Sequence, residues 1–154
     1  MPIQLAGRFL RRGNRAVGDK CPIDRAMQVV GTRSAVLLMR EAYYGATRFD
    51  EFAARVGITE SVAAKRLAEL VGAGLLEKQA YKEPGQRTRF EYVVTDSGRD
   101  LMPAVFALGQ WAAKHVPHQG TPTMTHADCG ASAGVAFVCR EGHRVKTDAL
   151  VVTG

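Results

Sequence analysis

The stretch FDEFAARVGITESVAAKRLAELVGAGLL, from Phe49 to Leu76, decides the fold. Apolar residues recur at helical spacing in its first part, Gly57 follows as a stop signal, and Thr59 carries a hydroxyl suited to cap a second helix. The second helix has Ala63, Leu67, Leu70 and Val71 on its inner side, and Glu60, Ser61, Ala64, Lys65 and Ala68 on its outer side. The stretch predicts a helix-turn-helix, whose outer side faces the major groove of DNA.

A β-hairpin is predicted directly after this motif. Residues 75–82 and 89–94 have the pattern of two strands, and Pro84-Gly85 between them is turn chemistry. The tip and flanks of the hairpin carry Lys82, Arg87 and Arg89. A helix-turn-helix followed by such a hairpin is a winged helix, and arginines on a wing suit phosphates or the minor groove.

Three further helices are expected around the motif, over residues 22–30, 33–44 and 96–115. The second of them is apolar on nearly all sides, so we expect it to be central. The third has an apolar stripe formed by Leu101, Val105, Leu108, Trp111 and Ala112. No other part of the winged unit needs this stripe, so we expect a dimer helix that pairs with the N-terminal segment; packing within the monomer is the alternative.

Cys21 stands at the predicted N-terminus of the first of these helices, before Pro22. Free backbone N–H groups at a helix N-terminus stabilise a thiolate, so Cys21 is a candidate redox-sensing residue. The alternative is a small, half-buried cap residue.

Charge is distributed unevenly along the 154 residues, whose net charge is +6. Residues 1–20 hold five basic side chains and one acidic one, and the remainder holds 16 basic and 14 acidic ones, or +2. Nucleic-acid binding would therefore use a local patch. We expect residues 1–20 to be a basic arm, either a disordered tail or a segment that follows DNA or lies on a partner subunit. No apolar run is long enough for a membrane span and no signal peptide is recognisable, so we expect a cytoplasmic protein.

The segment 117–154 is expected to be a C-terminal β extension that follows the winged domain of residues 21–116. Its candidate metal ligands are His126, Cys129, Cys139 and His143, in two close pairs. Such pairs favour a tetrahedral, structural zinc site. The alternative is two thiols and two surface histidines without metal. Three cysteines are an odd number, which argues against a disulfide framework.

From Cys21 to about Val116 the chain resembles the HxlR family of bacterial winged-helix regulators, which are relatives of the MarR type. The resemblance is carried by Cys21-Pro22, the helix around Thr32 to Arg40, RFDEF at 48–52, GIT at 57–59, KRLAEL at 65–70, AGLL at 73–76, and YVVT at 92–95 with Gly98. It implies a homodimer that reads a pseudo-palindromic operator in double-stranded DNA, and a sensing role for Cys21. Family recognition helices often begin Ser-Pro-Arg-Thr, whereas this one begins TESV at 59–62. An expected basic contact is therefore missing.

Together these patterns predict an α+β, mainly helical protein with the winged helix-turn-helix architecture. The expected function is that of a dimeric, sequence-specific transcriptional regulator, a repressor, which responds to a thiol signal or to a ligand that no residue identifies. The expected DNA-binding residues are Thr59, Ser61, Ala64, Lys65, Arg87 and Arg89. A winged helix that binds proteins and not DNA is the alternative, favoured by Glu60 and by the near-neutral globular part. An enzyme is not expected, because no catalytic spacing is visible.

Overall fold

The computed structural model describes residues 3–11, 13–14, 16, 18, 20–82, 84–85, 87–117, 119–120 and 122–153. The described ranges leave out Arg12, Arg15 and Asp19 of the expected basic arm, Glu83 and Gln86 between the two predicted strands, and His118 and Thr121 of the C-terminal extension. The chain forms two compact units, Gly18–Phe106 and Met1–Val17 together with Ala107–Gly154. Among the described residues, no helix is both long and apolar enough to cross a membrane.

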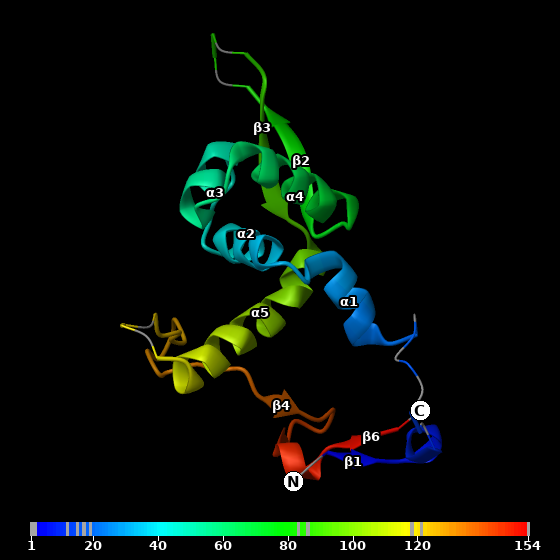
Figure 1. Ribbon diagram of the computed structural model, residues 1–154. Helices are drawn as coiled ribbons and strands as arrows, with labels where there is room; N and C mark the ends of the chain where they lie inside the picture. The colour runs from blue at the N-terminus through cyan, green and yellow to red at the C-terminus, as the bar shows by residue number, and fades with distance from the viewer. Residues whose placement is uncertain are drawn as a thin grey trace. The chain divides into compact units, whose positions relative to one another are not determined.

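The first unit contains the winged helix-turn-helix (Figure 1). Its elements are α1 (Pro22–Val30), α2 (Arg33–Tyr43), α3 (Phe49–Val56), α4 (Glu60–Gly72), β2 (Leu76–Tyr81), β3 (Arg89–Val94) and the first half of α5 (Asp96–His115). All of them agree with the sequence prediction to within a residue or two. The predicted α+β, mainly helical class is confirmed.

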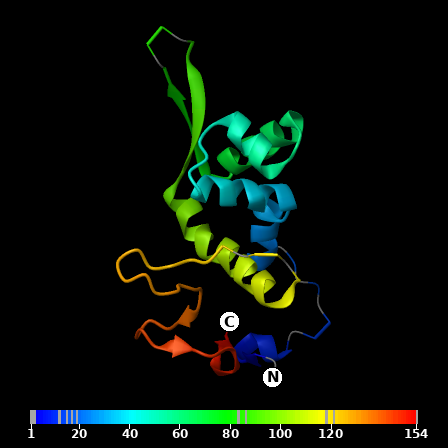
Figure 2. The ribbon, with the colours of Figure 1, turned by 90° about the vertical axis from the view of Figure 1, so that its left-hand side faces the viewer.

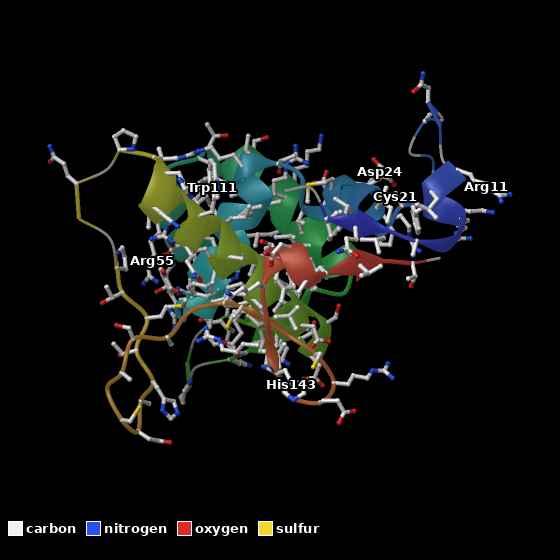
Figure 3. All side chains as sticks on the ribbon, turned by 90° about the horizontal axis from the view of Figure 1, so that it is seen from below. Arg11, Cys21, Asp24, Arg55, Trp111 and His143 are labelled. Carbon is white, nitrogen blue, oxygen red and sulfur yellow. The ribbon has the colours of Figure 1, made fainter. Side chains whose placement is uncertain are left out.

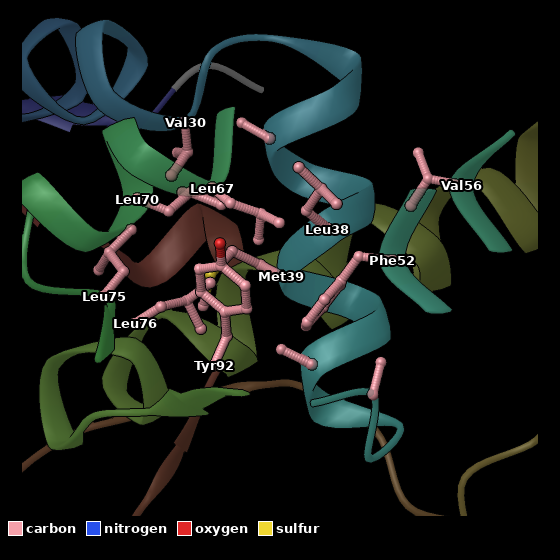
Figure 4. Close-up of a cluster of buried hydrophobic side chains, with 13 residues drawn as sticks. Val30, Leu38, Met39, Phe52, Val56, Leu67, Leu70, Leu75, Leu76 and Tyr92 are labelled. Atoms are coloured by element: carbon pink, nitrogen blue, oxygen red, sulfur yellow. The ribbon is translucent and has the colours of Figure 1, made fainter. Parts of the chain in front are cut away.

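The core of this unit is built around α2, as its apolar sequence predicts. Leu38 and Met39 of α2 are fully buried, and so are Phe52 of α3, Leu67 and Leu70 of α4, and Leu76 of β2. The ring of Phe52 meets that of Tyr92 edge-on, with their centroids 5.9 Å apart (Figure 4). The helix-turn-helix and the hairpin therefore share one core and form a single packed body.

The turn between α3 and α4 has the geometry that the sequence predicts. Gly57 adopts a left-handed conformation with φ of 67°, which a residue with a side chain rarely adopts. Ile58 packs against the core. The hydroxyl of Thr59 accepts a hydrogen bond of 3.3 Å from the backbone N–H of Val62 and so caps α4.

The hairpin β2–β3 is antiparallel, with Leu76 opposite Val94 and Tyr81 opposite Arg89. Figures 1 and 2 show that it projects beyond α3 and α4, as a wing does. Its base is bonded to the segment before α3. The N–H of Tyr92 donates to the carbonyl of Thr47 at 2.8 Å, and the backbones of Arg48 and Glu91 form an isolated antiparallel β-bridge.

The second unit consists of short elements. They are β1 (Gln4–Leu5), a 3₁₀ helix at Gly7–Arg11, β4 (Phe137–Val138), β5 (Arg144–Val145), a 3₁₀ helix at Thr147–Ala149 and β6 (Val151–Val152), besides the second half of α5. β4 pairs with β5, and β1 pairs in parallel with β6. None of the described residues in this unit is buried.

The structure adds detail to two parts of this second unit. Residues 4–11, within the expected basic arm, form a strand and a 3₁₀ helix, and β1 pairs with β6, which no pattern in the sequence predicts. The expected C-terminal β extension contains strands, of which β4 and β6 are each two residues long.

Candidate nucleic-acid interface

The outer side of α4 is exposed, as the helical pattern predicts. Ser61, Ala64 and Lys65 are open to solvent, whereas Ala63, Leu67 and Leu70 on the opposite side are fully buried. Three of the predicted DNA-binding residues thus lie on one accessible helix face. Glu60, in the first turn, is also exposed and adds a negative charge at the end of this face that would meet phosphate.

Arg66 has a different environment from Lys65. It is partly buried and forms an ion pair with Glu69 one turn further along α4. Such an (i, i+3) pair stabilises a helix surface. Arg66 therefore stabilises α4, whereas Lys65 is the basic side chain exposed on its outer face.

An open groove of about 530 Å³ lies beside this face, between α3, α4 and the wing. It is lined by Arg48, Phe49, Asp50, Ala64, Lys78, Tyr81, Arg89, Phe90 and Tyr92. Ala64 and Arg89, two predicted DNA-binding residues, both line it. Ser61, Lys65 and Arg87 do not, although each is exposed.

Arg48 and Lys78 are cations of this groove that the sequence analysis did not single out. Each lies over an aromatic ring: the guanidinium carbon of Arg48 is 5.1 Å from the ring centre of Tyr81, and Nζ of Lys78 is 4.5 Å from that of Phe90. Such contacts are attractive and limit the orientations that the charged group adopts. With Arg89 they give the groove three cations against the carboxylate of Asp50, counted among the described residues that line it.

A signal for Lys78 was present in the strand alternation. Lys78 pairs with Tyr92, so it lies on the same face of the hairpin as Phe90 and Tyr92. The register that reveals this pairing depends on the turn between the strands, which the sequence does not fix. Arg48 enters the sequence analysis only within RFDEF at 48–52, as part of the family resemblance.

The segment before α3 is held in place by Glu51. Its Oε2 accepts hydrogen bonds of 3.1 Å from the backbone N–H groups of Arg48 and Thr47. These bonds hold the pKa of the Glu51 carboxyl below its ordinary value, and the bond from Arg48 has the larger effect. Because Arg48 is the residue just before α3, this network fixes the backbone from which its side chain reaches the groove.

Cys21 lies at the N-cap of α1, as predicted, and is half-buried. Figure 3 shows it near Asp24 on the same helix. Its side chain makes no capping hydrogen bond. The sensing role stays a prediction.

The four predicted metal ligands do not converge. Nδ1 of His126 lies 3.2 Å from Sγ of Cys129, and a backbone hydrogen bond of 3.0 Å joins Cys139 to His143. Within the described part of the chain, no three or more His, Cys, Asp or Glu side chains are grouped to hold a metal ion. Each pair is therefore local, and a zinc site that unites them stays a prediction.

Known proteins resemble the chain over most of its length. It is 35% identical over 119 residues to Rv3095 of Mycobacterium tuberculosis, an uncharacterized HTH-type transcriptional regulator. The aligned residues cover 76% of this chain and 74% of the relative. PA1607, a candidate transcription factor, has a crystal structure that matches 87% of this chain and 94% of its own, with 28% identity and a TM-score of 0.75. The redox regulator HypR in its reduced form matches 60% of this chain and 91% of its own, with 26% identity and a TM-score of 0.55.

The family assignment rests on residues 29–120, which match the model of the HxlR-like helix-turn-helix. This range contains α2 to α5, the outer face of α4 and the whole groove. The homologues are named as transcriptional regulators and not as enzymes. The chain belongs to the HxlR-like helix-turn-helix family and is a transcriptional regulator of the HTH type.

Proposed function

We propose that the protein is a homodimer that binds a pseudo-palindromic operator in double-stranded DNA and represses transcription. One observation carries this proposal: the exposed face of α4 adjoins a basic groove. Ala64 of α4 and Arg89 of the wing line the same groove. Binding to chromosomal DNA places the protein in the cytoplasm.

The binding mode follows from the two surfaces. Ser61, Ala64 and Lys65 enter the major groove and contact base edges, while Thr59 lies at the helix end next to the backbone. Arg48, Lys78 and Arg89 hold phosphates beside that groove, and Arg87 near the hairpin tip reaches the flanking backbone or minor groove. The two aromatic rings stabilise the cations before DNA arrives, so less side-chain freedom is lost on binding.

The dimer is formed through α5. Leu108 and Trp111 of its predicted apolar stripe have exposed fractions of 58% and 60%, and Trp111 is labelled in Figure 3. Ile23 and Met27 of α1 are exposed as well, at 72% and 51%. Leu101 packs against the core of the monomer instead, so the first half of α5 is anchored and the second half is available for association.

The test is salt-dependent binding of the purified protein to the DNA upstream of its own gene and to a scrambled duplex. We expect Arg48→Ala, Lys78→Ala and Arg89→Ala each to reduce the slope of log K against log salt by about one, because each removes a phosphate contact. Lys65→Ala should in addition reduce the preference for the cognate duplex. Arg140→Ala, in the second unit, is the matched control and should leave the slope unchanged.

A flat salt response without sequence preference would contradict the proposal. It would favour a protein-binding module instead, and the acidic side chains Glu60 and Asp50 beside the interface would then be the residues to substitute first.

We also propose that Cys21 makes DNA binding responsive to oxidants. Support comes from its position at a helix N-terminus and from the similarity to HypR, a redox regulator. Oxidant should release DNA from the wild type and not from Cys21→Ser, whereas Cys139→Ser should behave as the wild type. Release that is the same in Cys21→Ser would exclude this role.

A further inference from the structure

The start of α5 is bonded directly to the segment that leaves α4. Gly74 ends the helix region with a left-handed φ of 73°, and Leu75 follows it into β2. The hydroxyl of Thr95 donates to the carbonyl of Gly74 at 2.6 Å, and its backbone N–H donates to the carbonyl of Leu75 at 3.2 Å. Thr95, which caps α5, is therefore also hydrogen-bonded to the segment that follows α4.

Gly98 brings the two segments together more closely than any other residue could. A Cβ at this position would lie 2.2 Å from the carbonyl oxygen of Leu75 and 2.9 Å from Cγ1 of Val94. The N–H of Gly98 donates to the Thr95 hydroxyl at 3.0 Å. The first turn of α5 thus rests on backbone, which cannot move aside as a flexible side chain would.

Tyr43 of α2 supplies a second fixed point on the same turn. Its hydroxyl donates to the carbonyl of Gly98 at 2.7 Å, and its ring lies 6.1 Å from that of Phe106 further along α5. Burial raises the pKa of Tyr43 to about 12, so the hydroxyl keeps its proton and remains a donor at neutral pH.

We propose that Thr95, Gly98 and Tyr43 form a joint that fixes the direction of α5 relative to α4 and thereby sets the spacing between the two operator half-sites. This inference rests on the proposed function, in which α5 joins the two subunits and α4 of each reads one half-site. The three are positioning residues, since they act through α4 and do not touch DNA.

The geometry makes spacing sensitive to this joint. Phe106, the last residue of the winged unit, is 8 residues beyond Gly98 in α5, which corresponds to about 12 Å along a helix. A tilt of about 16° at the joint displaces that point by about 3.4 Å, which is the rise of one base pair. A small change of angle is therefore enough to alter which spacing fits both recognition helices.

The experiment measures affinity for a series of duplexes derived from the wild-type protein's best upstream sequence, in which the spacer between the half-sites changes one base pair at a time. We expect the wild type to lose about tenfold in affinity one base pair away from its optimum, because the second recognition helix then misses its groove. Gly98→Ala should shift the optimum, and Thr95→Val and Tyr43→Phe should flatten the profile to less than about threefold.

Matched controls separate positioning from stability. Tyr44→Phe changes the neighbouring exposed tyrosine, and Ser97→Ala changes an exposed side chain in the same turn of α5 as Gly98. Both should keep the wild-type profile. Thermal unfolding and sedimentation are measured for every variant, to show that each one folds and forms dimers. If Gly98→Ala does not fold, Tyr43→Phe, which is the mildest change, still tests the joint.

The outcomes are distinguishable. If the three residues have a purely structural role, their substitution lowers affinity for all spacers equally and leaves the profile unchanged. That result would refute the proposed role of the joint in spacing, and the proposal that the protein binds DNA would remain. Selective binding by the wild type without any spacer preference would overturn it too. If the wild type does not prefer its upstream DNA to scrambled DNA, the proposed function itself fails.

Discussion

The two units of the chain differ in how they are held together. In the winged unit, α2, α3, α4 and the hairpin share a core with fully buried side chains such as Phe52 and Leu67. In the other unit none of the described residues is buried, and its strands, each two residues long, pair through their backbones. Isolated pairs of this kind are marginal in water. The free energy of folding therefore resides in the winged unit.

The largest expected effect comes from the core itself. Phe52→Ala should lower the free energy of unfolding by about 3–5 kcal/mol, because it removes a fully buried ring and leaves a cavity beside Tyr92. The matched change Phe137→Ala in β4, where the ring is 56% exposed, should cost less than about 0.5 kcal/mol. Urea unfolding followed by circular dichroism checks both. Equal losses would mean that β4 is covered in solution and would break the comparison.

The second prediction concerns the exposed half of α5. Trp111→Ala should weaken the dimer by about 2 kcal/mol, because large aromatic side chains near an interface centre carry much of its energy. The core is untouched by this change, so the winged unit should unfold as before once it is monomeric. Sedimentation equilibrium measures the association, with Val151→Ala, another exposed apolar residue, as the control. A Trp111→Ala protein that remains as dimeric as the wild type would place the interface elsewhere.

A third, smaller effect is expected at the cap of α4. Thr59→Ala removes the acceptor for the N–H of Val62 and should cost about 1 kcal/mol. Thr123→Ala makes the same change at an exposed position of the second unit and should have no measurable effect on thermal unfolding. A difference between the two variants would sharpen the assignment of stability to the winged unit, and its absence would contradict it.

The smallest effect depends on pH. The pKa of Glu51 is held below its ordinary value of 4.5, so its ionised form stabilises the folded state; this contribution is complete above pH 4.5 and is lost as the pH falls through the lowered pKa. Glu51→Gln should therefore cost less than about 1 kcal/mol at neutral pH, and the difference from wild type should shrink in acid. Glu141→Gln is the control in the second unit. A difference that stays constant from neutral pH into acid would show that the charge of Glu51 does not matter.

Sequence reasoning succeeded where periodicity and local chemistry decide the structure. The helical spacing from Phe49 to Leu76, the stop at Gly57 and the cap at Thr59 are local signals, and all appear as predicted. The groove could not be foreseen in the same way, because Arg48 and Lys78 come to line it only through the register of the hairpin and its attachment to the segment before α3. The close approach of Gly98 to Leu75 is likewise a long-range contact, although Gly98 was noted as a family position.

The pairing of β1 with β6 has a consequence for the order of folding. The hydrogen bonds from Gln4 to Leu150 and from Ala6 to Val152 close a loop that contains the entire winged unit. Contacts between residues so distant in sequence are slow to form, and the loss of chain entropy on closure opposes them until the intervening chain is compact. We therefore expect the winged unit to fold first and β1 to join β6 last, so that this pair is also the first to separate when the protein unfolds.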